Sequence, residues 1–158
     1  MRYCPSCGTP LASRLQGTQQ RPTCPACGFI HFADPKVAVA VVITSADGVL
    51  LGRRLNEPGR GRWALPAGYV DRGEALEAAA AREAREELNV DVAIDRLVGL
   101  YSAAGDPVIL AVYAATITAG APRAGDDLDA VGYFPTDALP DLAFARDEGI
   151  VRGTQPHF

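Results

Sequence analysis

The stretch that decides the fold is residues 68–90, GYVDRGEALEAAAAREAREELNV. From Glu74 to Leu88 it is rich in alanine and contains neither glycine nor proline, which predicts a single helix. Asn89 follows at the position where a residue in the left-handed conformation commonly ends a helix. We therefore expect a glycine-containing loop, a helix over 74–88 and an abrupt helix end.

Three carboxylates of this helix lie on one face. Glu83, Glu86 and Glu87 are spaced i, i+3 and i+4, so their side chains are neighbours. Like charges at this spacing repel, and the single Arg82 cannot neutralise all three. A divalent cation can, because carboxylate oxygens are the ligands that Mg²⁺ prefers. The alternative interpretation is a solvated acidic face without a ligand.

The wider pattern of this stretch resembles the Nudix box, G-x5-E-x7-R-E-U-x-E-E-x-G-U, in which U is an apolar residue. The matching positions are Gly68, Glu74, Arg82, Glu83, Ala84, Glu86, Glu87 and Val90. The penultimate glycine of the box is Asn89 here, and asparagine also tolerates the left-handed conformation.

The resemblance implies an α/β fold, the Nudix α/β/α sandwich around a mixed β-sheet. It also implies hydrolysis of a nucleoside diphosphate joined to another moiety, with Mg²⁺ or Mn²⁺ as cofactor. By position, the cation would be held by the carbonyl of Gly68 and by Glu83, Glu86 and Glu87. Arg82 would orient the carboxylates, and Glu74 would brace the loop at the start of the helix.

Four cysteines form a second motif near the N-terminus. Cys4, Cys7, Cys24 and Cys27 are spaced C-x2-C-x16-C-x2-C, within the near-repeats CPSCG and CPACG. Four thiolates at this spacing predict a closed, structural Zn²⁺ site, and the glycine after each pair is expected to adopt a positive φ. Iron in the same cage and two disulfides are the alternatives. Metal binding would also explain how so short a segment folds without a core of its own.

These motifs predict two domains, a zinc ribbon over 1–33 and a Nudix hydrolase domain over 34–158. Within the second domain, the apolar Val37–Thr44 predicts a central strand buried on both faces. A hairpin turn at 47–48 leads to a second strand, and further strands are expected over 90–101, 108–118 and up to residue 134.

Composition limits the classes of partner. The chain has 158 residues, 48% of them hydrophobic, and a net charge of −4, so no overall positive field favours nucleic acid or an acidic membrane surface. Its longest apolar run is far shorter than the roughly 20 residues that span a bilayer. The first residues lack the apolar region of a signal peptide. We expect a cytoplasmic protein that acts on small molecules.

The flanking sequence narrows the expected substrate. The segments CPSCG, CPACGFIHFADPKVAV, GRWALPAGYVDRGE and LPDLAFA are similar to a zinc-ribbon Nudix subgroup of FAD and ADP-ribose pyrophosphatases. We therefore expect a small dinucleotide or nucleotide-sugar substrate. FAD or ADP-ribose is the first candidate, and its cleavage would release AMP. NADH pyrophosphatases also carry four cysteines, but their SQPWPFPxS stretch is missing from GLYSAAGDPVILAVY. An NADH or NAD-cap pyrophosphatase is one alternative, and a catalytically silent zinc-ribbon protein that binds nucleic acid or senses a ligand is another.

Several side chains are candidates for substrate contact. A basic, glycine-rich loop is expected over 52–62, and the guanidinium groups of its Arg53, Arg54, Arg60 and Arg62 suit phosphates, with Arg53 and Arg62 as the first candidates. A base or flavin ring suits Trp63 and Tyr69. The general base is open among Glu86, Glu87, Asp126, Asp127 and Asp129. The sequence also leaves open whether the ribbon is purely structural, covers substrate or supports a homodimer.

Overall fold

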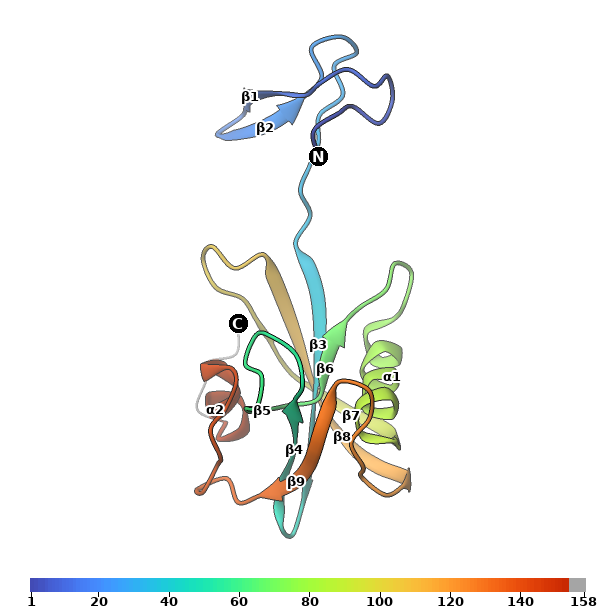
Figure 1. Cartoon of the computed structure of the whole chain (residues 1–158), viewed down its shortest axis with the longest axis vertical. Helices are drawn as coiled ribbons and strands as arrows, with labels where there is room; N and C mark the ends of the chain where they lie inside the picture. The colour runs from blue at the N-terminus through green and yellow to red at the C-terminus, as the bar shows by residue number, and fades with distance from the viewer. Residues whose placement is uncertain (154–158) are drawn as a thin grey trace. The chain divides into compact units, whose positions relative to one another are not determined.

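The computed structural model describes residues 1–153 and separates into two compact units, Met1–Pro35 and a second unit from Lys36 onward (Figure 1). The first unit holds an antiparallel hairpin of β1 (Ala12–Gln16) and β2 (Gln19–Thr23). This hairpin was not expected from the sequence, because most of its side chains are exposed on both faces and leave no alternating pattern.

Within residues 36–153, seven strands form one mixed sheet. The elements are β3 (Lys36–Ser45), β4 (Gly48–Arg54), β5 (Trp63–Ala64), β6 (Ala67–Tyr69), α1 (Leu76–Leu88), β7 (Val90–Tyr101), β8 (Val108–Gly120), β9 (Leu128–Phe134) and α2 (Ala145–Val151). The central path of the sheet runs β5-β4-β3-β8-β7, while β6 also pairs with β3 and β9 with β4. Strand β3 is parallel to β8 and antiparallel to its other neighbours, so the sheet is mixed as expected.

Strand β3 is buried on both faces, and its alternating side chains enter two different cores. Val39, Val41 and Ile43 pack in the core that contains the alanine-rich face of α1. Ala38 and Ala40 belong to a second core that includes Ile150 of α2. The two helices therefore cover opposite faces of the sheet (Figure 1), which confirms the α/β/α sandwich.

Helix α1 begins two residues later than the sequence predicts and ends where predicted. The helix begins at Leu76 rather than at Glu74, because Glu74 lies in the preceding loop and accepts a hydrogen bond from the Asp71 N–H at 3.0 Å. Asn89 ends the helix with φ 58°, the left-handed conformation predicted for it. Residues 52–54 belong to β4, although the sequence predicted a loop there.

Among the residues that the structure describes, no helix is long and apolar enough to cross a membrane.

Candidate functional site

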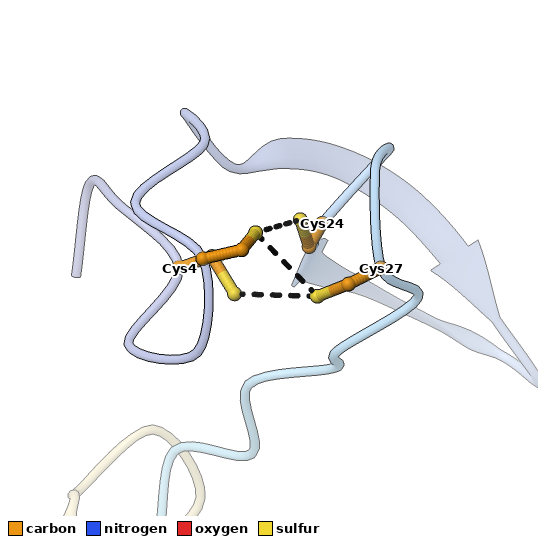
Figure 2. Close-up of side chains that lie close together, drawn as sticks. Cys4, Cys24 and Cys27 are labelled. Carbon is orange, nitrogen blue, oxygen red and sulfur yellow. Dashed lines mark hydrogen bonds between the residues drawn. The ribbon is translucent and has the colours of Figure 1, made fainter.

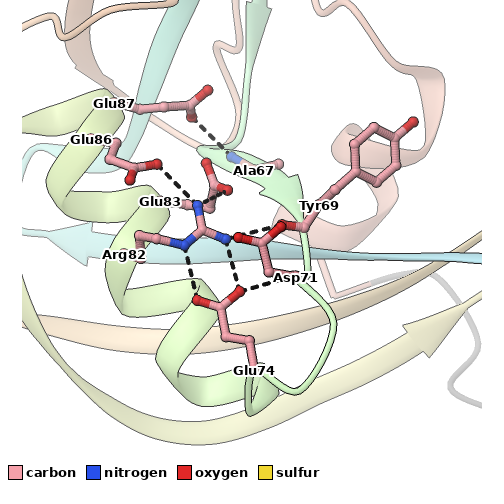
Figure 3. A network of polar contacts seen from close by, with 8 residues as sticks. All are labelled: Ala67, Tyr69, Asp71, Glu74, Arg82, Glu83, Glu86 and Glu87. Atoms are coloured by element: carbon pink, nitrogen blue, oxygen red, sulfur yellow. Dashed lines mark hydrogen bonds and ion pairs between the residues drawn. The ribbon is translucent and has the colours of Figure 1, made fainter.

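Arg82 is the centre of the network formed by the box residues (Figure 3). Its guanidinium makes a forked pair with Glu74, at 2.9 Å from Nε and 3.0 Å from one terminal nitrogen. The other terminal nitrogen donates to Glu83 at 2.6 Å and to Glu86 at 3.0 Å. A further bond at 3.0 Å reaches the carbonyl oxygen of Tyr69 on β6. One arginine thus joins the loop, the strand and the helix face.

Glu74 is held firmly as a charged group. The hydrogen bonds from Arg82, and then the one from the Asp71 backbone, lower the pKa of Glu74 to about 2. The carboxylate therefore ties residues 71–74 to the middle of α1 at any physiological pH.

The two buried glutamates of the box are Glu83, which Arg82 contacts, and Glu87, which it does not. Burial raises the pKa of Glu83, against the opposing effect of Arg82. Burial also raises the pKa of Glu87 to about 7, although the Ala67 N–H donates to its Oε2 at 3.0 Å. Two desolvated carboxylates side by side disfavour ionisation, and a bound cation would relieve that cost.

Gly68 makes the close approach of strand and helix possible. A Cβ at this position would lie 2.1 Å from Oε1 of Glu83, so no larger residue fits without moving that carboxylate. The residue sits in β6, opposite Val39 of β3. The requirement for glycine therefore comes from the contact with Glu83, and Gly68 does not need a positive φ.

The glutamates offer suitable donors but are not gathered around one point. Within residues 1–153, only the four cysteines have ligand atoms that all lie within 4.8 Å of one another. Glu83 and Glu86 are turned to Arg82, and Glu87 to the Ala67 N–H (Figure 3). The Glu86 side chain is 53% exposed, which leaves room for its carboxylate to rotate from Arg82 toward a cation. The oxygen donors fit Mg²⁺ or Mn²⁺.

A cavity of about 460 Å³ lies beside β6. Gly68 and Tyr69 form part of its wall, together with Arg54 at the end of β4 and with Phe144 and Arg146 at α2. Its volume is within the range of small-molecule sites, roughly 300–1,000 Å³.

The four expected substrate contacts separate into two groups. Tyr69 lines the cavity, whereas Arg53, Arg62 and Trp63 do not. Arg53 forms a two-pronged ion pair with Asp129, at 2.7 and 3.2 Å.

The other two are also engaged outside the cavity. Arg62 lies 3.3 Å from Asp141, and Trp63 packs edge-on against Phe134 with 4.6 Å between ring centres. Arg54, one of the four arginines considered from the sequence, does line the cavity. Sequence reasoning missed Phe144 and Arg146 in the cavity wall, since α2 lies about 90 residues from β4 along the chain and no motif links them.

The three candidate aspartates have different environments. Asp129 is occupied by Arg53, and Asp127 accepts a 2.7 Å hydrogen bond from Asn56. Asp127 is near enough to Glu87 to contribute to the rise in its pKa. Asp126 is exposed. Of the three, Asp127 is therefore the one whose charge acts on a box glutamate.

The four cysteines converge in the first unit (Figure 2). Sulfur–sulfur distances are 3.6 Å for Cys4–Cys27, 3.5 Å for Cys7–Cys24 and 3.6 Å for Cys7–Cys27. A disulfide requires about 2.05 Å, whereas four thiolates at about 2.3 Å around a tetrahedral metal are separated by about 3.8 Å. The thiols are free, so the disulfide alternative is not what the structure shows.

The two cysteine turns have the same backbone geometry. Gly8 and Gly28 adopt φ of 73° and 77°, as predicted, and each N–H donates to the carbonyl oxygen of the first cysteine in its turn. The repeated turn directs both sulfurs of each pair to one side.

Each of the two units of the chain matches a known protein family. The NUDIX domain family matches residues 34–152, and the Nudix N-terminal family, a zinc ribbon, matches residues 2–33. An ADP-ribose pyrophosphatase of Methanocaldococcus jannaschii is 36% identical over 124 residues, covering 76% of this chain and 72% of the relative. An NAD-capped RNA hydrolase NudC of Pseudomonas aeruginosa is 30% identical over 146 residues, covering 92% of this chain but only 51% of that protein.

Solved structures show the same relationship. A NUDIX hydrolase from Nitrosomonas europaea superposes with a TM-score of 0.89 at 32% identity, covering 100% of this chain and 96% of the other. The loop, the helix and its glutamate face are therefore part of a Nudix fold, as the box implies. The chain belongs to the Nudix hydrolase family and carries the family's N-terminal zinc ribbon.

Proposed function

We propose that this protein hydrolyses the diphosphate linkage of nucleoside diphosphate derivatives, with ADP-ribose or FAD as substrate and AMP as a product. The observation that carries this proposal is the Arg82-centred glutamate network beside a cavity large enough for a nucleotide half. The name of the Methanocaldococcus jannaschii relative supports ADP-ribose as the first candidate.

The residues proposed to hold Mg²⁺ or Mn²⁺ are the carbonyl of Gly68 and the carboxylates of Glu83, Glu86 and Glu87. Their hard oxygen donors fit either ion, and burial raises the pKa of both Glu83 and Glu87, a desolvation cost that a bound cation would offset. When bound, the cation supplies a more acidic water and neutralises charge on the diphosphate.

The reaction adds the oxygen of water to one phosphorus and breaks the bond from that phosphorus to the bridging oxygen. One proton of the water passes to a general base, and the bridging oxygen leaves on the other phosphate. Arg82 orients Glu83 and Glu86, and Glu74 braces the loop before the helix. The base is Glu86, Glu87, Asp126 or Asp127, because the carboxylate of Asp129 is already paired with Arg53.

We further propose that the first unit binds one structural Zn²⁺ through Cys4, Cys7, Cys24 and Cys27. The sulfur spacing supports a closed four-thiolate site, with no position left for a reacting water.

A second candidate function is hydrolysis of NADH or NAD-capped RNA. The name of the Pseudomonas aeruginosa relative favours it, and that similarity extends over both units of this chain. Against it, this chain spans about half of that relative and lacks the SQPWPFPxS stretch.

A parallel substrate panel separates these candidates. FAD, ADP-ribose, NADH, NAD, an NAD-capped RNA, a diadenosine polyphosphate and 8-oxo-dGTP are each incubated with Mg²⁺ or Mn²⁺, and products are resolved by chromatography. We expect AMP from ADP-ribose or FAD at the highest kcat/KM, abolished by EDTA. Preference for NADH or capped RNA supports the second candidate, and no cleavage of any substrate with either ion rejects hydrolysis.

A further inference from the structure

Two arginines meet on one aromatic ring in the wall of the cavity. Arg54 comes from the end of β4, and Arg146 comes from α2. Their guanidinium carbons lie 5.3 and 5.2 Å from the centre of the Phe144 ring. Cations over an aromatic face are attracted by it, so Phe144 holds two positive groups close together in spite of their mutual repulsion.

Neither arginine is neutralised by a short ion pair. Within residues 1–153, Arg54 donates from Nε to the carbonyl oxygen of Pro58 at 2.8 Å and pairs with no carboxylate. Arg146 lies 3.9 Å from Asp106 and 3.9 Å from Asp147, beyond hydrogen-bond distance. Its Nε is buried and has no hydrogen-bond partner in the described part of the chain.

The acidic side chains of the cavity wall, Glu57 and Asp106, are both engaged by backbone N–H groups, and Asp106 accepts a hydrogen bond from the Val108 N–H at 2.9 Å. Glu57 accepts a hydrogen bond from the Gly59 N–H at 3.0 Å. The wall therefore presents two guanidinium groups whose hydrogen-bonding capacity is mostly unused. Forked guanidinium donors match the oxygens of phosphate better than any other side chain does.

The rest of the cavity suits the organic part of a nucleotide. Ala38, Val108 and Leu110 give it an apolar lining, and Tyr69 adds an aromatic ring. Gly68 belongs to the same wall and touches Glu83 of the box, so a diphosphate could contact the arginines and the glutamate face together.

We propose that Arg54 and Arg146 bind the diphosphate oxygens of the substrate and that Phe144 holds both guanidinium groups in place. This inference deepens the proposed hydrolysis and rests on it for the identity of the substrate. Residues outside the Nudix box would then supply part of the affinity for the diphosphate. Arg53 and Arg62, the first candidates from the sequence, are paired with aspartates outside the cavity.

The test compares Arg54→Gln and Arg146→Gln with wild-type protein and with Arg152→Gln. Arg152 is a matched control, because it caps the same helix as Arg146, pairs with Glu148 at 3.1 Å and does not line the cavity. Binding of ADP is measured by calorimetry in EDTA, and KM and kcat are measured for ADP-ribose with Mg²⁺. Thermal unfolding verifies that each variant is folded.

Each cavity variant should weaken ADP binding and raise KM by about 10- to 100-fold while kcat changes by less than about threefold. Arg152→Gln should match wild type in both assays. Arg54→Lys and Arg146→Lys should recover only part of the loss, since an ammonium cannot form the fork.

The two assays distinguish failure of the subsite from failure of the proposed function. If wild-type protein cleaves no substrate, weakened ADP binding in the arginine variants still supports the subsite. Wild-type protein that does not bind ADP, or arginine variants that bind ADP with wild-type affinity, would overturn it.

Discussion

At the scale of single residues, the short distance between Gly68 and the Glu83 carboxylate explains why the first position of the box is glycine. The strand that carries Gly68 passes so close to α1 that a single added carbon would overlap the Glu83 carboxylate. Glu83 is in turn bonded to Arg82. A change at the glycine therefore reaches the arginine network through Glu83.

Gly68→Ala should lower kcat for AMP release by at least about tenfold, because displacing a positioned carboxylate by about 1 Å misaligns the site. Steady-state kinetics on ADP-ribose measure this, and urea unfolding checks that the variant remains folded. Wild-type kcat in the alanine variant would show that the position of Glu83 does not matter for turnover.

Asp147 is a second residue whose environment has a measurable consequence. It is 3% exposed, and burial raises its pKa to about 6, against the opposing effect of a hydrogen bond from the Leu65 N–H. Arg146 and Arg54 also act to lower this pKa. The folded protein thus keeps a proton that the unfolded chain releases near pH 4.

Because the folded state binds more protons in this window, the contribution of Asp147 to stability falls as pH rises from about 4 to 6. Asp147→Asn removes the ionisation and should raise the free energy of unfolding at pH 7 by about 2 kcal/mol relative to wild type. Near pH 4 the two proteins should differ little. Urea unfolding across pH 4–7 measures the difference, and a gap that does not change with pH contradicts this explanation.

At the scale of elements, the end of α1 is set by Asn89. Its φ of 58° suits asparagine and glycine, and its side-chain Nδ2 donates to the Arg123 carbonyl oxygen at 3.1 Å. That bond ties the helix end to the loop after β8. Asparagine therefore performs the turn that glycine performs in the usual box, with an added hydrogen bond.

Asn89→Ala should lower the free energy of unfolding by about 1–2 kcal/mol, since alanine is strained at positive φ and loses the hydrogen bond. Asn89→Gly should stay within about 1 kcal/mol of wild type, because it loses the bond but is relaxed at this φ. Urea unfolding of the three proteins tests the ranking. A glycine variant less stable than the alanine variant would contradict it.

The elements with strong local signals could be predicted from sequence. The strand over 90–101, the end of α1 at Asn89 and the strand buried on both faces near 37–44 all follow from periodicity and from turn residues. The hairpin of β1 and β2 could not be predicted, because its side chains are mostly exposed on both faces. The cysteine turns that flank it lie in the same unit, and the proposed metal site there would compensate for the missing buried face.

The candidate site also has a part that the sequence predicts and a part that only the fold shows. The glutamates and Arg82 are close in sequence, so helical spacing alone brings them together. The cavity joins Arg54 to Arg146 across about 90 residues, and only the fold makes them neighbours. Among the basic residues of the 52–62 loop, sequence could not tell which would be paired with an aspartate on another element.

At the scale of the whole molecule, the two units are stabilised by different means. The second unit has two cores on the faces of its sheet. The first unit has few buried side chains, among them Cys4 and Cys24. A unit of this size ordinarily needs disulfides, a metal or oligomerisation to fold, and its four cysteines are free thiols close enough to bind a metal.

Purified protein should therefore contain one equivalent of zinc, and chelation should release it. Hydrogen exchange should then show lost protection in residues 1–35 while β3, β8 and the other strands of the second unit stay protected. Elemental analysis before and after chelation provides the control. Unchanged exchange in the first unit after complete metal removal would mean that it folds without a metal.

We propose that the glutamate face of α1 catalyses hydrolysis of a nucleotide diphosphate linkage. The most direct measurement is kcat for AMP release from ADP-ribose, with saturating Mg²⁺, by wild type, Glu86→Gln and Glu87→Gln. Glu148→Gln serves as a control, because that residue lies on α2 and pairs with Arg152. We predict a loss of several orders of magnitude in both box variants, with shape and folding retained, and wild-type turnover in the control. Near-wild-type turnover in both Glu86→Gln and Glu87→Gln would show that this face of α1 does not catalyse the hydrolysis.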